Sequence, residues 1–245
     1  MEKKYKLTDE TINLCGKKLC RIKALKDFGD VKKGDKGGFI EDEHNLSHDG
    51  NSWVYGDACV CGDAMVYGNA RVYDNAMVYG DACVCGDAMV YGNARVYDNA
   101  MVYGDACVCG DAMVYGNARV YGDACVCGDA MVYGNAMVYG NARVYGNAMV
   151  YGNARVYDNA RVYGNARVYG DAKIENNFDY IVFKNWWSSG RYFTWTRSND
   201  MWKVGCFYGT GEELIKKAYK DSELSGRQYE RIVKYVEEIK KENGK

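Results

Sequence analysis

The 245-residue chain contains no proline and only two histidines. Its charges almost cancel, with 32 Lys and Arg against 33 Asp and Glu and a formal net charge of −1 at pH 7. This balance argues against a general binder of nucleic acids or other polyanions. The scarcity of histidine excludes His-rich metal sites and leaves little room for His-based catalysis. No apolar run approaches the roughly 18 residues that a membrane-spanning helix needs.

The first six residues lack the apolar stretch that is typical of a signal peptide. We therefore expect a cytoplasmic protein, located in the cytosol of a host cell, in which the eleven cysteines would be reduced thiols. Because 48% of the residues are hydrophobic, a disordered chain is excluded.

Twenty consecutive hexapeptides occupy residues 54–173 without an insertion. Each begins with Val, from Val54 to Val168, and has Ala at the fifth position, from Ala58 to Ala172. The second position is Tyr or Cys, and the third is Gly except at Asp74, Asp98 and Asp158. Strict repetition at a fixed period is the signature of a solenoid and not of a low-complexity disordered tract.

The spacing predicts a short strand and a corner in every hexapeptide. Side chains alternate along a strand, so Val points inward while the residues on either side of it point outward. Gly-Asn and Gly-Asp are turn dipeptides, and Ala fits a tight corner. Three hexapeptides then make an 18-residue coil whose strands pair in parallel with those of the next coil.

This pattern resembles the hexapeptide signature of left-handed parallel β-helix proteins. The resemblance covers about half of the chain and implies a mainly β fold of that type. The left-handed sense comes from the resemblance and not from the residues, since crossovers are usually right-handed.

Three parts of the chain are expected: an N-terminal β cap at 1–53, the solenoid at 54–174 and a small C-terminal α+β module at 175–245. In the cap, 15–18 and 35–38 are interpreted as turns, Cys15 and Cys20 as strand residues, and the solenoid is predicted to begin near His48. Segments 21–40, 45–47 and 50–55 resemble the N-terminal cap of hexapeptide-repeat proteins of phages, prophages and enterobacteria, some of them called acetyltransferases without demonstrated activity. This resemblance implies a phage or prophage origin and assigns no activity.

The C-terminal module is predicted to contain strands at 178–183, 191–196 and 201–207, followed by helices at 214–220 and 229–241. Capping boxes are expected at 210–213 and at 225–228.

Many left-handed β-helix proteins are CoA-dependent acyltransferases with a histidine base on the solenoid. Here 54–173 contain neither His nor Glu, so no general base is available on the coils.

The repeat also pairs Cys107 with Cys125 and Cys109 with Cys127 on adjacent coils. A spacing of about 6.5–7 Å between thiols along a strand fits zinc badly. We expect no metal, no cofactor and no catalytic residue, with the cysteines acting as small outward side chains.

Sixteen Tyr and eight Met project from the repeat. Contiguous apolar stripes usually mark an interface, although tyrosine ladders also stabilise stacked strands. We expect a homo-oligomer through these Tyr/Met faces, with a trimer favoured because trimers are typical of the family that the repeat resembles. One face is predicted to carry at its sixth positions Cys59, Met77, Arg95, Met113, Met131, Met149 and Arg167.

A candidate ligand- or partner-binding site combines a Trp-rich loop with a band of cations at the end of the solenoid. Its residues are Trp186, Trp187, Arg191, Arg155, Arg161 and Arg167. The alternative is a solvated edge, with the tryptophans packed in a core.

The preferred hypothesis is a non-catalytic, phage-type β-solenoid binding protein. It would engage a host protein or sequester a small anionic ligand, as a counter-defence protein would. No membrane or nucleic-acid partner is expected. A CoA-dependent acyltransferase of the hexapeptide family and a structural rod or tail-associated protein of the virion remain alternatives.

Overall fold

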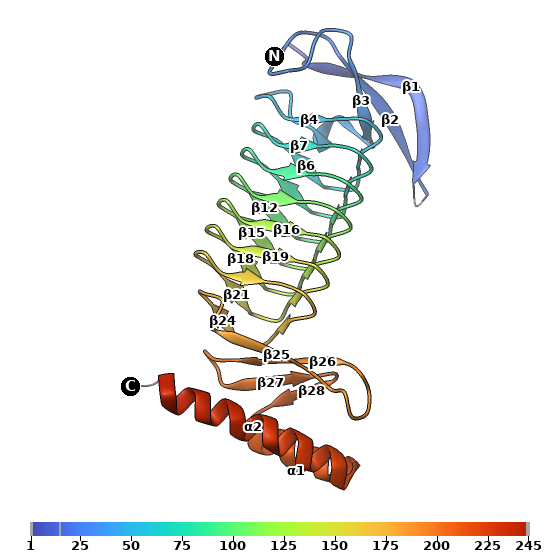
Figure 1. The fold of residues 1–245 in the computed structure, drawn as a ribbon. Coiled ribbons are helices and arrows are strands. Elements are labelled where there is room, and N and C mark those ends of the chain that lie inside the picture. The colour runs from blue at the N-terminus through green and yellow to red at the C-terminus, as the bar shows by residue number, and fades with distance from the viewer. Residues whose placement is uncertain (1, 15, 244–245) are drawn as a thin grey trace.

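In the computed structural model, which describes residues 2–14 and 16–243, the repeats stack into a rod with the two chain termini at opposite ends (Figure 1). An N-terminal β cap covers one end, and a four-stranded sheet with two helices covers the other. None of the helices among the described residues has the length and apolar character that crossing a membrane requires.

The solenoid is a β-solenoid with three parallel sheets, which we call faces 1, 2 and 3. Face 1 contains β3 (Lys36–Ile40), β5 (Cys59–Val60), β8 (Met77–Val78), β11 (Arg95–Val96), β14 (Met113–Val114), β17 (Met131–Val132), β20 (Met149–Val150) and β23 (Arg167–Val168). Face 2 contains β4 (Trp53–Val54), β7 (Arg71–Val72), β10 (Met89–Val90), β13 (Cys107–Val108), β16 (Cys125–Cys127), β19 (Arg143–Tyr145) and β22 (Arg161–Val162). Face 3 contains β6 (Met65–Val66), β9 (Cys83–Val84), β12 (Met101–Tyr103), β15 (Arg119–Tyr121), β18 (Met137–Val138), β21 (Arg155–Val156) and β24 (Lys173–Ile174).

The predicted alternation and the 18-residue coil are both confirmed. Val96 pairs with Val114, 18 residues later, and the same register holds along all three faces. Every first-position Val and fifth-position Ala of the repeat is fully buried. Because two small residues per hexapeptide fill the interior, no larger core residue is required, and the core is one continuous column.

The third position of each hexapeptide adopts a left-handed backbone conformation, which explains the preference for Gly. A Cβ at Gly110 would lie 3.0 Å from the amide nitrogen of Gly128 in the next coil. Asp tolerates this conformation better than most residues. Asp74 and Asp98 have φ values of 63° and 58°, and their carboxylates accept the amide N–H groups of Gly92 and Gly116, each at 3.2 Å.

Parallel stacking begins upstream of His48, earlier than the pattern predicts. Phe39 and Ile40 of β3 pair with β5, and Leu46 forms a bridge with Val66. The predicted turn at 35–38 is wrong, because Gly37 and Gly38 lie within β3 and the preceding turn is closed by the amide N–H of Asp35 to the carbonyl of Lys32. Backbone and side chains crowd both glycines, so neither has room for a Cβ.

The N-terminal cap is a hairpin of β1 (Tyr5–Leu14) and β2 (Lys17–Ala24), with β2 also pairing with β3. This confirms the predicted hairpin turn around Gly16 and the strand position of Cys20. Cys15 lies outside the described residues. A short 3-10 helix, Glu43–Asn45, links β3 to the coil.

Backbone hydrogen bonds join each coil to the next in the parallel pattern. The amide N–H of Arg95 donates to the carbonyl of Ala112 in the next coil at 2.9 Å, and the same bond recurs along each face. The first coil is therefore left with carbonyl groups, and the last coil with N–H groups, that have no partner in a further coil. The last coil also has an outward carbonyl at Arg161, which accepts a hydrogen bond from the Tyr180 hydroxyl at 2.9 Å.

The N-terminal cap supplies donors. The fully buried Lys4 ammonium donates to the carbonyl of Ser52 at 2.8 Å. The Tyr5 hydroxyl donates to the carbonyl of Leu46 at 2.7 Å, and the Arg21 guanidinium donates to the carbonyl of Gly37 at 2.8 Å.

The C-terminal module supplies acceptors, one for each face. The amide N–H groups of Arg161, Arg167 and Lys173 belong to the last strands of faces 2, 1 and 3. They donate to Asn177 Oδ1 at 2.9 Å, Thr194 Oγ1 at 2.8 Å and Ser198 Oγ at 2.7 Å, respectively. These three side-chain oxygens replace the carbonyls of an absent next coil.

The C-terminal sheet has four antiparallel strands: β25 (Tyr180–Lys184), β26 (Tyr192–Thr196), β27 (Met201–Val204) and β28 (Phe207–Gly209). The predicted strand at 201–207 is two strands, because the chain turns at Gly205, where φ is 56°. Residues alternate across β26: Thr194 faces the solenoid, whereas Phe193 and Trp195 pack with the helices.

The two predicted helices are present, but both begin earlier than expected. Helix α1 (Gly211–Asp221) has the predicted capping box between Thr210 and Glu213. Helix α2 (Glu223–Asn243) contains the whole segment 225–228, so the second predicted capping box is wrong. Ser222 caps α2 instead, its hydroxyl accepting the amide N–H of Ser225 at 3.1 Å.

The acceptor cap predicts a specific stability loss. Replacement of Thr194 by Val leaves the amide of Arg167 without its partner and should destabilise the protein by about 1–3 kcal/mol. Urea unfolding measures the change, and Ser189→Ala in the exposed loop is the control. Equal stability of the two variants would show that the last coil does not depend on this acceptor.

Lys4 predicts a pH dependence. Burial lowers the pKa of Lys4 to about 8, whereas an unfolded Lys titrates near its ordinary value of 10.5. Between these values the unfolded state binds more protons, so this residue's contribution to stability rises with pH. The free energy of unfolding of the native protein, relative to Lys4→Met, should increase on the order of 1–2 kcal/mol from about pH 7 to about pH 9.5. A constant difference between the two proteins across this range would contradict the lowered pKa.

Candidate functional site

Tyrosine ladders cover much of the solenoid surface. On face 1, five rings stack from Tyr79 to Tyr151 with centroid separations of 4.7–4.9 Å, and the Tyr169 ring follows at 4.6 Å with an interplanar angle of 37°. On face 3, four rings stack from Tyr103 to Tyr157 at 4.9–5.2 Å. Each ring therefore contacts its neighbours on adjacent coils, and the ladders form continuous aromatic strips.

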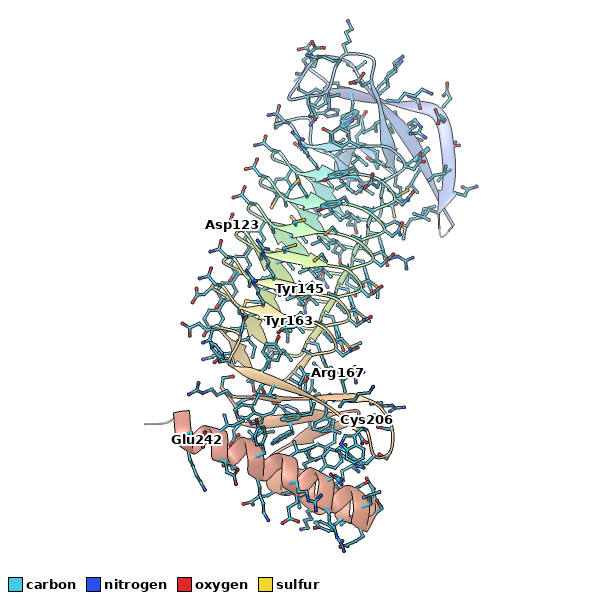
Figure 2. All side chains as sticks on the ribbon, in the orientation of Figure 1. Asp123, Tyr145, Tyr163, Arg167, Cys206 and Glu242 are labelled. Carbon is cyan, nitrogen blue, oxygen red and sulfur yellow. The ribbon has the colours of Figure 1, made fainter. Side chains whose placement is uncertain are left out.

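Face 2 has an interrupted ladder. Tyr55, Tyr73 and Tyr91 are in contact at one end, and Tyr145 and Tyr163 stack at 5.4 Å at the other (Figure 2). The two intervening coils carry Cys109 and Cys127 at the equivalent positions.

The row of sixth-position residues on face 1 is the one predicted from the sequence, as the pairing of β5, β8, β11, β14, β17, β20 and β23 shows. Met113, Met131 and Met149 are consecutive in this row and lie beside the tyrosine ladder. Face 1 therefore combines the longest ladder with three adjacent methionines.

The Trp-rich loop divides into one exposed and one packed ring. Trp186 is 72% exposed. Trp187 packs against Tyr229 of α2, with ring centroids 4.9 Å apart, and against Phe193 at 6.3 Å. Arg191 is exposed, and its amide N–H donates to Ser189 Oγ at 3.4 Å.

The band of arginines at the end of the solenoid is spread over all three faces of the rod. Arg155 lies on face 3, Arg161 on face 2 and Arg167 on face 1, so their side chains leave the rod in three directions. The expected stacking of Arg143 on Arg161 and of Arg155 on Lys173 is present. Trp187 belongs to the helix side of the C-terminal sheet, whereas the last coil contacts the opposite side, which separates this ring from the arginines.

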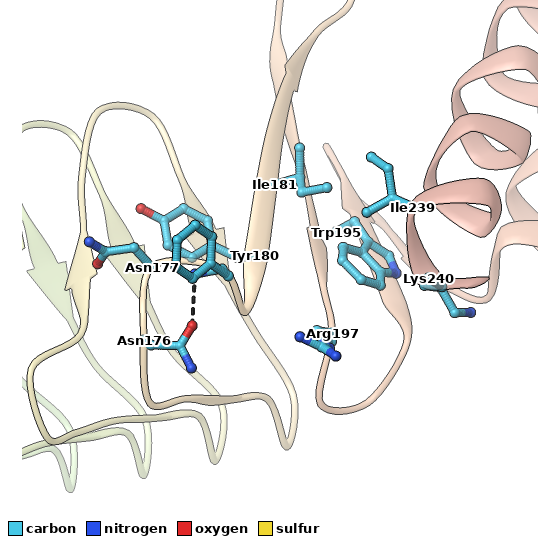
Figure 3. A pocket seen from close by; sticks show the side chains of 9 residues that line it. Asn176, Asn177, Tyr180, Ile181, Trp195, Arg197, Ile239 and Lys240 are labelled. Carbon is cyan, nitrogen blue, oxygen red and sulfur yellow. Dashed lines mark hydrogen bonds between the residues drawn. The ribbon is translucent and has the colours of Figure 1, made fainter. Parts of the chain in front are cut away.

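A cavity of about 620 Å³ lies where the C-terminal sheet meets α2 (Figure 3). Its lining includes Phe178, which is 82% exposed, together with Trp195, Arg197 and Lys240. Lys240 is engaged by Asp200 at 2.6 Å and by Glu237 at 2.8 Å. Among the described residues, 2–14 and 16–243, no acidic side chain forms an ion pair with Arg197. Of the two cations in the lining, Arg197 is therefore the one available to a ligand.

Sequence reasoning missed most of this cavity. Arg197 lies in a turn, and Phe178 follows two asparagines, so neither has a recognisable motif. The exposed aromatic residue next to the end of the repeat was the only available signal. The two residues approach each other because the chain folds back from β26 to the start of β25, where Tyr180 pairs with Thr196.

The cysteines of face 2 are closer than the sequence predicts. Cys107 and Cys125 are paired as expected, but the Sγ atoms of Cys107, Cys109 and Cys125 all lie within 4.8 Å of one another. The predicted distance between the two thiols of one strand assumed that their side chains are parallel, whereas side chains at i and i+2 can rotate toward each other. Hydrogen bonds from Cys107 and Cys125 lower the pKa of Cys109, and the contact with Cys107 raises that of Cys125.

The repeats match a known family model described as YdcK Beta solenoid repeat. The repeat region is similar to the YdcK β-solenoid family. The matched segments all lie between residues 70 and 176: 70–86, 94–110, 106–122, 112–128, 124–140, 130–144, 142–158, 154–170 and 160–176. No curated protein matches the chain. The YdcK description names a fold and no activity, so the phage or prophage origin stays a prediction.

The two tryptophans of the loop should respond differently to truncation. Trp187→Ala removes a ring packed between β26 and α2 and should cost about 3–5 kcal/mol. Trp186→Ala removes an exposed ring and should change stability by about 0.5 kcal/mol or less. Thermal unfolding of both variants measures the contrast, and a larger loss for Trp186→Ala would contradict the assignment.

Proposed function

We propose that the protein is a non-catalytic binding solenoid that self-associates through face 1. The observation that carries the proposal is the aromatic strip from Tyr79 to Tyr169, flanked by Met113, Met131 and Met149. Contiguous apolar stripes of this kind mark interfaces, and Tyr gives a large contact area with little loss of side-chain entropy.

The regular spacing of the strip favours a second copy of the same chain as the partner. Ring centroids repeat every 4.6–4.9 Å along six coils. Tyr79 packs against the N-terminal cap, and the Lys203 ammonium lies over the rings of Tyr151 and Tyr169, so the rings from Tyr97 to Tyr133 form the free part of the array. Another array with the same period matches these rings in register. An irregular protein surface would meet only a few of the rings in register.

Face 1 is also less charged than face 3, which supports it as the contact surface. The outward sixth positions of β15, β21 and β24 on face 3 carry Arg119, Arg155 and Lys173. On face 1, only Arg95 and Arg167 interrupt the corresponding row. Like charges facing each other across a self-association interface cost free energy, so the face with fewer cations is favoured.

Both histidines serve the N-terminal cap, which supports a binding role over acyl transfer. His48 accepts the amide N–H of Lys4 through Nδ1 at 3.1 Å and stacks on Tyr5 at 4.3 Å. His44 Nε2 lies 2.9 Å from the carbonyl oxygen of Gly62.

In the proposed assembly, the ligand is a host protein or a small anion, and the cavity lined by Phe178 and Arg197 is the recognition site.

Oligomeric mass tests the proposal. The native chain should elute as an oligomer in size-exclusion chromatography with light scattering. Pairing of face 1 with itself gives a two-fold dimer, whereas pairing with a different face gives a closed trimer. Tyr115→Lys with Tyr133→Lys, which places two cations within the strip, should yield monomers.

The matched control is Tyr121→Lys with Tyr139→Lys, because these rings stack in the same way on face 3. If the native mass is that of a dimer, this variant should keep it; if it is that of a trimer, dissociation of this variant as well identifies face 3 as the second surface. A monomeric native chain, or a Tyr115→Lys with Tyr133→Lys variant that keeps the native mass, would overturn self-association through face 1. Circular dichroism checks that both variants remain folded.

A further inference from the structure

The middle of face 2 carries a cluster of thiols that the binding function proposed above does not use. Cys107 and Cys109 lie on one coil, and Cys125 and Cys127 lie on the next. Cys109 and Cys127 take the place of tyrosines in the ladder between Tyr91 and the Tyr145–Tyr163 stack. All four residues are half-buried.

The cluster arises from a change in sequence spacing. The Cys-Val-Cys pairs at 59, 83 and 107 follow one another at 24 residues, whereas 107 and 125 are separated by the 18 residues of one coil. Only the 18-residue spacing places one pair directly over another. Cys83, by contrast, is flanked on adjacent coils by Met65 and Met101.

The distances suit a soft metal ion. The Sγ atoms of Cys107, Cys109 and Cys125 lie within 4.8 Å of one another. Metal–sulfur bonds of about 2.3 Å in tetrahedral geometry require sulfur atoms about 3.8 Å apart, so shifts of roughly 1 Å would close the site. Cys127 interacts with the thiols of Cys109 and Cys125 and is available as a fourth ligand.

We propose that Cys107, Cys109 and Cys125, with Cys127 beside them, bind one soft metal ion of the Zn²⁺ or Cu⁺ class. Thiolate sulfur selects such ions over hard cations such as Mg²⁺, which prefer oxygen ligands. Binding joins two adjacent coils through their side chains and releases the thiol protons to solvent. The Tyr91 hydroxyl, which accepts a hydrogen bond from Cys107 at 3.5 Å, lies at the edge of the site.

Metal titration of the native, fully reduced chain tests the proposal directly. Zn²⁺ and Cu⁺ are added separately in competition with a chromophoric chelator, with Mg²⁺ as the negative control. The expected result is one ion per chain for at least one of the two soft ions and none for Mg²⁺. Which of the two ions binds more tightly decides between a zinc and a copper site.

Thiol protection locates the ion without a mutation. Bound metal should protect Cys107, Cys109 and Cys125 from alkylation, as read by mass spectrometry of the peptides, while Cys83 and Cys85 stay reactive. Protection of Cys83 and Cys85 to the same extent would overturn the assignment.

A matched pair of variants completes the test. Cys107→Ser with Cys109→Ser removes two ligands, so affinity should fall by more than the roughly 100-fold that loss of an outer-sphere partner costs. Cys83→Ser with Cys85→Ser changes the same Cys-Val-Cys motif on a coil without a stacked partner and should leave affinity unchanged. Equal affinities in the two variants would overturn the proposal. It would also be overturned if the native chain bound neither soft ion, or if Cys107 and Cys125 formed a disulfide in place of metal uptake.

Discussion

The backbone hydrogen-bond ladder between coils is the constraint on which the rest of the structure depends. Arg95 donates to Ala112 in the next coil, and the same bond recurs along the rod, so the first and last coils have ladder groups that only a cap can satisfy. Lys4 and Tyr5 donate at the beginning, and Thr194 and Ser198 accept at the end. Exposed ladders of this kind pair with other chains, so both caps also limit uncontrolled growth of the rod.

The ladder also dictates what the surface can display. Identical hexapeptides place identical side chains at a fixed pitch, which converts single tyrosines into the continuous strip of face 1. The same rule separates Arg161 from Arg167, since consecutive hexapeptides always occupy different faces. Repetition along the rod therefore creates extended surfaces. A compact site needs either suitable residues 18 positions apart or the change from the solenoid to another fold at the end of the repeat.

Two features of the molecule meet that requirement. The thiols of Cys107 and Cys125 are one coil apart in sequence and become neighbours across the ladder. The cavity beside Phe178 and Arg197 forms where the solenoid gives way to the C-terminal sheet and α2. The proposed metal site thus lies where the spacing of the Cys-Val-Cys pairs changes from 24 to 18 residues, and the proposed ligand site lies where the hexapeptides end.

The sequence by itself determined the β-solenoid, the 18-residue coil, the inward Val and Ala and the composition of each face, because these follow from a period and from steric size. It also predicted the hairpin around Gly16 and the capping box at Thr210. Only the tertiary structure decided that Lys4 is buried as a donor, that Thr194 is an acceptor, that Trp187 is packed while Trp186 is exposed, and that three thiols converge. These depend on contacts between distant segments and on side-chain rotamers, for which the local sequence carries no periodic signal.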